Sequence, residues 1–128
     1  MLTITRRFGF EAAHCLPGHS GKCSSFHGHS YKLDVTVRRF SDCGKTISGG
    51  SSEGMITDFS DLKNIVNKTI IEKLDHKNLN EVYTFRPTAE NMCMDIYDLL
   101  GCELTNHHLY LVSVRLWETE DSYAEVSG

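Results

Sequence analysis

The sequence predicts an α+β fold, in which two helices lie on one face of a mainly antiparallel sheet. Two segments near the N-terminus place apolar residues at every second position, which is the period of a half-buried strand. Two segments in the middle place them at helical spacing, and a third long strand pattern follows near the C-terminus. The expected order is β, β, β, α, α, β, β in a single domain, residues 1–128.

The two N-terminal strands are expected at residues 2–12 and 30–40. In the first, apolar side chains fall on even positions, interrupted by Arg6: Leu2, Ile4, Phe8, Phe10 and Ala12. In the second, one face carries Tyr31, Leu33, Val35 and Val37. The segment 15–26 between them is rich in glycine, serine and proline, which indicates a loop that would join antiparallel neighbours.

The later elements follow from turn chemistry and helical spacing. The turn-rich stretch 41–54 is expected to lead into a short hairpin strand, Met55–Phe59. A helix should follow, with Ser60 as its N-cap and an apolar stripe at Leu62, Ile65, Val66, Thr69, Ile70 and Leu74. A second helix should run from the N-cap Thr88 to about Leu100, where Gly101 would stop it. Residues 109–118 and 122–126 predict two further, paired strands.

Composition limits the classes of partner. The formal net charge of −4 disfavours non-specific nucleic-acid binding, which depends on basic patches. The first ten residues lack the apolar core of a signal peptide, and no run reaches the roughly 20 apolar residues of a membrane span. Five cysteines without a CxxC pair argue against a disulfide framework, so we expect a cytoplasmic protein. Sheet edges that two helices cannot cover favour a homo-oligomer.

Three histidines can meet at one end of the first two strands. His27 and His29 are two residues apart, so on a strand their side chains share a face, with Cα atoms roughly 6.6 Å apart. His14 ends the first strand and would lie across from them. Three neutral imidazoles without a fourth protein ligand are typical of a catalytic zinc site with one open position. His19 is a weaker candidate because it lies in the loop.

Cys23 precedes His27 by four residues, and this spacing leaves two roles open. As a fourth ligand, the cysteine would close the zinc site and make it structural. Beside the metal instead, and next to Lys22, its thiol would favour the thiolate form, which can act as a base or a nucleophile.

Two acidic positions and one Asp-His pair are further candidates. Asp75 and His76 end the first helix, where they suit either a helix terminus or an acid–base pair. Glu90 lies in the first turn of the second helix, a position that the helix dipole alone would explain. Glu118 ends an apolar strand, where a carboxylate needs a partner; accepting two N–H donors, it would hold a guanidine-like edge.

Six short motifs together resemble one enzyme family, the 6-pyruvoyl-tetrahydropterin synthase and 6-carboxy-tetrahydropterin synthase family. They run almost from end to end of the chain: FGFEAAH at 8–14, CSSFHGH at 23–29, GMITDFSDLK at 54–63, LDHKNLN at 74–80, PTAEN at 87–91 and WET at 117–119. Each motif is modest alone, but their joint order is specific. The resemblance implies the tunnelling fold (T-fold), in which subunits join their sheets into an oligomeric barrel, a hexamer built as a dimer of trimers, with active sites at subunit interfaces.

The resemblance also implies a role for each candidate residue. Zinc (Zn2+) would be held by His14, His27 and His29. Cys23 would be the catalytic thiol rather than a ligand, with Asp75 and His76 as its acid–base partners. Glu118 would hold the pterin ring, and Thr88 and Glu90 would line the same pocket.

The three-residue gap between Cys23 and His27 resembles the queuosine (7-deazapurine) branch, which makes 6-carboxy-5,6,7,8-tetrahydropterin from 7,8-dihydroneopterin triphosphate. The animal pyruvoyl enzymes, by resemblance, have a longer gap, and a folate-precursor branch has a glutamate there that this chain lacks. The alternatives are a 6-pyruvoyl-tetrahydropterin synthase and a non-catalytic pterin-binding homologue. The substrate triphosphate needs cations, for which Lys22, Arg6, Arg7 and His19 are candidates that sequence alone does not rank.

Overall fold

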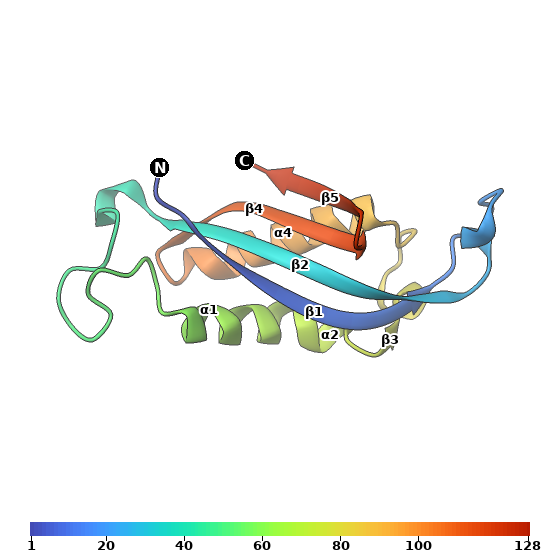
Figure 1. Cartoon of the computed structure of the whole chain (residues 1–128), viewed down its shortest axis with the longest axis horizontal. Coiled ribbons are helices and arrows are strands. Elements are labelled where there is room, and N and C mark those ends of the chain that lie inside the picture. The colour runs from blue at the N-terminus through green and yellow to red at the C-terminus, as the bar shows by residue number, and fades with distance from the viewer.

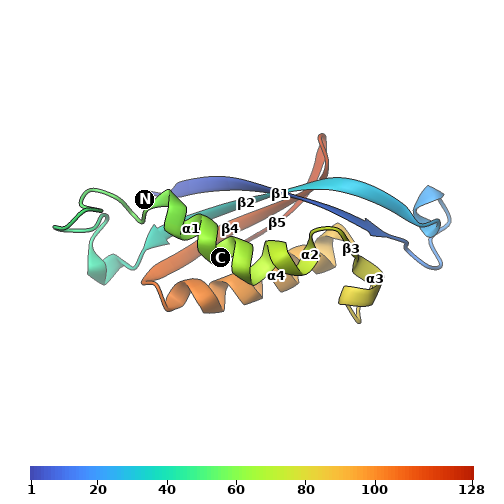
Figure 2. The same ribbon diagram turned by 90° about the horizontal axis from the view of Figure 1, so that it is seen from below.

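Five strands form one sheet, and helices cover one of its faces (Figure 1, Figure 2). The computed structural model describes residues 1–128. The strands are β1 Ile4–His14, β2 His27–Arg39, β3 Lys77–Asn78, β4 Leu109–Thr119 and β5 Ser122–Ser127. Their order across the sheet is β3-β1-β2-β4-β5, and every neighbouring pair is antiparallel except β1 with β3. The predicted α+β class is therefore confirmed.

Two helical rods cover the sheet. The first comprises α1, Phe59–Val66, a π-helical segment, Asn67–Ile71, and α2, Glu72–Leu74. The second is α4, Ala89–Thr105, and the short α3, Leu79–Val82, lies between the rods in sequence. The first rod buries four of the six residues of the predicted apolar stripe, Leu62, Val66, Ile70 and Leu74, while Ile65 and Thr69 are half-buried. None of the helices combines the length and apolar character that a membrane span requires.

β1 and β2 form a long antiparallel hairpin. Its pairing runs from Ile4 opposite Val37 to His14 opposite His27. Side chains alternate across it, so the even residues of β1 and the odd residues of β2 face the helices. The predicted core residues of β2 are all fully buried: Tyr31, Leu33, Val35 and Val37. Loops 15–26 and 40–58 therefore lie at opposite ends of the hairpin (Figure 1).

The prediction of a short strand at Met55–Phe59 is wrong. This segment turns directly into α1, and Asp58 rather than Ser60 is the N-cap, because its carboxylate accepts a hydrogen bond from the Ser60 backbone N–H at 2.7 Å. The loop before it closes on itself, since Ile47 donates to the Met55 carbonyl instead of to a strand. Apolar residues such as Ile56 are buried here without forming a ladder.

The second helix does not stop at Gly101. α4 continues for another turn to Thr105, because Leu104 is fully buried and extends the apolar face of the helix. Sequence reasoning also missed β3, a two-residue strand that pairs with Ala12 and Ala13 of β1. β3 pairs only with the last part of the outer edge of β1. Residues 4–11 of β1 do not pair with β3.

Candidate functional site

The hairpin register brings the three histidines together. His14 lies directly opposite His27, while His29 is two residues further along β2 and faces the same side of the sheet. One ring nitrogen from each residue lies within 4.8 Å of the others. His14 is fully buried, whereas His27 and His29 are partly exposed, so the cluster is reached from one side.

Backbone carbonyls orient two of the three imidazole rings. His14 Nδ1 lies 2.8 Å from the Pro87 carbonyl, and His27 Nδ1 lies 2.6 Å from the Ser25 carbonyl. A carbonyl oxygen can only accept, so each Nδ1 carries the proton and each Nε2 presents a lone pair. The two Nε2 atoms are 3.2 Å apart.

This arrangement fits a tetrahedral metal ion. Two lone pairs that face each other at this distance repel unless a cation or a proton lies between them. Nitrogen atoms about 2.05 Å from a tetrahedral zinc are roughly 3.3 Å apart, close to the separation of these two atoms. His29 Nε2 is buried without a hydrogen-bond partner, and burial lowers the pKa of this imidazole, which favours its neutral, ligating form. Three nitrogen donors with an open side suit catalytic Zn2+.

Glu118 approaches this cluster because of an irregularity in β4. Its Oε1 lies 3.7 Å from His29 Nε2. Along β4 the buried side chains are Leu109 and Leu111, then Val114 and Leu116. The alternation of buried and exposed side chains shifts by one residue at Val112, because this residue of β4 has no partner on β2. Without this bulge, Glu118 would point to the opposite face of the sheet, since a one-residue shift exchanges the faces.

A second bulge lies at Glu118 itself, where β4 has one more residue than β5 between two paired positions, and it adds local twist beside the cluster. The adjoining cavity, of about 270 Å³, is lined by Glu118 and by Glu90 of α4, which approach from different elements. Thr88 is the N-cap of α4, and its hydroxyl accepts the Asn91 N–H at 3.2 Å. The structure thus brings Glu118 and Glu90 together and gives Thr88 a helix-capping contact next to them.

Asp75 and His76 are held against the edge of β1. Asp75 accepts the Glu11 backbone N–H at 2.9 Å, while the His76 N–H donates to the Glu11 carbonyl at 2.6 Å. The bond from Glu11, followed by the contact with His76, lowers the pKa of Asp75. His76 has a φ of 59°, a left-handed conformation that costs a non-glycine residue on the order of 1 kcal/mol.

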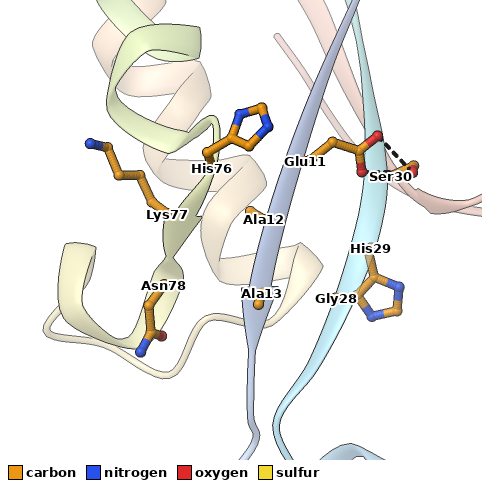
Figure 3. A pocket seen from close by; sticks show the side chains of 9 residues that line it. All are labelled: Glu11, Ala12, Ala13, Gly28, His29, Ser30, His76, Lys77 and Asn78. Carbon is orange, nitrogen blue, oxygen red and sulfur yellow. Dashed lines mark hydrogen bonds between the residues drawn. The ribbon is translucent and has the colours of Figure 1, made fainter.

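Within this pair, the His76 side chain points to solvent. His76 Nδ1 is 3.1 Å from Asp75 Oδ1, and the His76 side chain is 79% exposed. A cavity of about 510 Å³ over β1 is lined by both His76 and His29, together with Lys77, Glu11 and Ser30 (Figure 3). Ser30 donates to the Glu11 carboxylate in this cavity. His76 and one metal-ligating candidate, His29, thus adjoin one hollow.

Cys23 lies in a 3₁₀ turn, Lys22–Ser24, and is partly buried. The cluster of potential metal ligands contains the three histidines and no cysteine. The Cys23 carbonyl accepts the Leu16 N–H at 2.7 Å, which ties the two ends of the loop together. The loop therefore holds Cys23 beside the start of β2 without including it in the ligand set.

Three of the four cations named from the sequence have partners other than the three histidines. Arg7 forms two hydrogen bonds to Asp34, at 2.7 and 2.9 Å, and Arg6 donates to the Phe59 carbonyl. His19 accepts the Gly21 N–H within its own loop. Sequence reasoning also missed the carbonyls of Pro87 and Ser25, because a backbone acceptor leaves no signature in residue type.

Comparison with known proteins agrees with this geometry. The family model described as 6-pyruvoyl tetrahydropterin synthase matches residues 3–128. The chain is 35% identical over 146 residues to the 6-carboxy-5,6,7,8-tetrahydropterin synthase of Haemophilus influenzae, covering 98% of both chains. It is 43% identical over 98 residues to the enzyme of that name from Synechocystis, covering 76% of this chain and 73% of the relative.

Among solved structures, the chain is similar to the 6-pyruvoyl tetrahydropterin synthase of Caenorhabditis elegans. The TM-score is 0.79 at 26% sequence identity, over 99% of this chain and 95% of the other. The fold of the subunit is therefore that of the tetrahydropterin synthases, the T-fold.

Proposed function

Because the chain belongs to the 6-pyruvoyl tetrahydropterin synthase family, we propose that it is a 6-carboxy-5,6,7,8-tetrahydropterin synthase. The reaction converts 7,8-dihydroneopterin triphosphate and water to 6-carboxytetrahydropterin, acetaldehyde and triphosphate, and serves queuosine (7-deazapurine) biosynthesis. The observation that carries the proposal is the joint placement of three convergent imidazoles and Glu118, whose carboxylate lies 3.7 Å from His29. The relative from Haemophilus influenzae, named for this product and matched over 98% of both chains, supports this branch.

His14, His27 and His29 would hold the zinc ion, with one coordination position left for the substrate. Bound there, zinc supplies Lewis acidity that polarises the oxygens of the substrate side chain and acidifies the adjacent C–H and O–H bonds. The carbonyls of Pro87 and Ser25 keep the imidazoles of His14 and His27 in the ligating tautomer.

Glu118 would bind the pterin ring. Its carboxylate has two oxygens, which suit the parallel N–H donors of the ring nitrogen and the 2-amino group. Glu90 adjoins the same cavity and would accept a further N–H, while Thr88 fixes the start of α4 beneath it. Ring recognition on this side would direct the three-carbon side chain of the substrate toward the histidines.

Cys23, Asp75 and His76 would transfer the protons. Their task is to move protons along the side chain so that triphosphate leaves and the bond between the first and second side-chain carbons breaks. The first carbon remains on the ring as the carboxylate, and the other two leave as acetaldehyde. Asp75 would orient the imidazole of His76, 3.1 Å away, and Cys23 would serve as a second, thiolate base.

The exposure of the acid–base pair supports a homo-oligomer with interfacial sites, because proton transfer to a substrate is more effective where water is excluded. The His76 side chain is 79% exposed in the isolated subunit. It lies next to β1, and pairing of β1 with β3 is limited to Ala12 and Ala13. A second subunit that pairs with this edge would cover His76 and exclude water from the cavity that it lines. A hexamer, as a dimer of trimers, is the assembly that we propose.

Product identification tests the assignment. The protein is incubated with zinc and 7,8-dihydroneopterin triphosphate, acetaldehyde is trapped as a hydrazone, and the pterin is identified by mass. Acetaldehyde and 6-carboxytetrahydropterin in equal amounts are expected. A 6-pyruvoyl product without acetaldehyde would instead assign the sibling reaction, which the similarity to the Caenorhabditis elegans structure makes the second candidate. Pterin binding without triphosphate release would refute catalysis altogether.

A further inference from the structure

A basic hollow lies at the end of the β1–β2 hairpin that is remote from the histidines. It has a volume of about 370 Å³, and its polar lining comes from the end of β2 and the following loop: Arg38, Arg39, Ser41, Gly44 and Lys45. Arg38 lies nine positions after His29 along β2, which corresponds to roughly 30 Å at about 3.3 Å per residue. Figure 1 shows this loop and loop 15–26 at opposite ends of the molecule.

The charge of this hollow is uncompensated. Three of its lining residues are cationic and none is acidic, although the whole chain carries a formal net charge of −4. Two other arginines on the strands have carboxylate partners, Arg7 with Asp34 and Arg115 with Glu125, whereas Arg6 donates to a backbone carbonyl. No carboxylate oxygen lies within 4.0 Å of the cationic groups of the hollow. The N–H groups of these side chains are therefore not paired with a carboxylate and can bind an external anion.

The two arginines are held in place by other contacts. The Arg38 guanidinium stacks over the Tyr110 ring at 4.2 Å, and its Nη1 donates to the Arg39 carbonyl at 2.9 Å. Arg39 reaches the Ile56 carbonyl with Nη1 at 3.5 Å. Its Nε is buried and has no hydrogen-bond partner. A buried donor without a partner carries a desolvation cost, which a ligand that accepts its hydrogen bond would relieve.

We propose that this hollow binds a phosphate-bearing anion. Tetrahedral phosphate oxygens match the planar fork of an arginine, and a lysine adds a mobile point charge. The Ser41 hydroxyl supplies a further donor at the rim. The anion is either the triphosphate of a substrate that reaches across a subunit interface or a separate phosphorylated molecule. The proposal uses none of the histidines, and only the first of these two sources rests on the proposed function.

Titration calorimetry with inorganic tripolyphosphate tests this site. We expect one tripolyphosphate per chain, both in the protein as isolated and after chelation of metal, since binding at a metal centre would be lost on chelation. Lys45→Glu should weaken binding at least tenfold; Lys45 is exposed and makes no side-chain hydrogen bond, so the variant should fold. Lys68→Glu, the same charge change on the exposed surface of the π-helical segment, is the matched control and should bind normally.

Three results would overturn the proposal: no binding, binding only with metal present, or equal weakening by Lys45→Glu and Lys68→Glu. The source of the anion follows from kinetics. A raised KM for dihydroneopterin triphosphate in Lys45→Glu, with kcat unchanged, assigns the hollow to the substrate, whereas an unchanged KM assigns it to a separate anion. Tripolyphosphate binding in a protein without turnover would refute the proposed function and leave this site standing.

Discussion

Asp34 joins two parts of the open face of the sheet, and replacing it with alanine should weaken both stability and pterin binding. Its carboxylate accepts the Trp117 indole N–H at 2.9 Å as well as both bonds from Arg7. The Asp34 side chain is only 13% exposed, so these bonds are partly shielded from water. Trp117 directly precedes Glu118, and losing its partner would loosen the end of β4 that directs Glu118 toward the histidines.

The expected loss follows from these bonds. A hydrogen bond to a charged group contributes about 1.5–3 kcal/mol, and partial exposure favours the lower end, about 1.5 kcal/mol for the bond from Trp117. Arg7 is exposed and adds little. For a chain of this length the melting temperature should fall by roughly 5 °C. Urea denaturation measures the free energy of unfolding, and pterin affinity should fall several-fold while zinc content stays unchanged.

The loss should also depend on pH. Arg7 chiefly, and then Trp117, hold the pKa of Asp34 below its usual value near 4. A lowered folded-state pKa gives stability that is present above the unfolded-state pKa and is lost as pH falls through the folded-state pKa. The difference between wild type and Asp34→Ala should therefore be complete at pH 7 and shrink below about pH 4.

Glu125→Ala is the matched control, since Glu125 pairs with Arg115 on the same face, but its carboxylate is 36% exposed against 13% for Asp34. Its effect on stability should be smaller, and pterin affinity should not change. A destabilisation by Asp34→Ala that is under 0.5 kcal/mol, or that persists unchanged at pH 3, would refute the reasoning.

Three further substitutions have expected outcomes. Cys23→Ala should abolish turnover and retain the metal, because the ligand cluster holds no cysteine; loss of metal would make Cys23 a ligand. Glu118→Gln should raise the Kd for pterin at least tenfold without changing zinc content, and an unchanged Kd would remove Glu118 from the pocket. Gly101→Ala should raise the free energy of unfolding by about 0.5–1 kcal/mol, because Gly101 lies inside α4 and an added Cβ would meet nothing within 4 Å beyond the adjoining backbone of its own helix. A destabilised Gly101→Ala protein would show that a larger side chain is not accommodated there.

Alternation and helical spacing predict most of this fold because both reflect which face of an element is buried. The β2 face from Tyr31 to Val37 and the α1 stripe from Leu62 to Leu74 follow directly from period. The strand prediction for Met55–Phe59 fails because a stretch this short shows no clear periodicity. Asp58 decides the local structure by capping a helix. The prediction that the second helix ends at Gly101 fails because burial of Leu104 outweighs the weak helix propensity of one glycine.

The metal-ligand candidates are predictable for the same reason as the strands. Once β1 and β2 are antiparallel neighbours, the loop length places His14 opposite His27. The position of Glu118 is only partly predictable: the phase change from Leu111 to Val114 is visible in the sequence, but its structural meaning, a bulge, depends on pairing with β2. The attachment of Asp75 to the edge of β1 involves backbone groups of Glu11, which no residue pattern encodes.

The central claim is that three imidazoles on two paired strands form a zinc centre, and metal content measures it most directly. Wild-type protein, reconstituted with zinc and freed of excess, should contain one zinc per chain by elemental mass spectrometry. His29→Ala should contain almost none while retaining wild-type circular dichroism, because its Nε2 is one of only three convergent donors. A full complement of zinc in His29→Ala, or none in the wild type, would contradict the account.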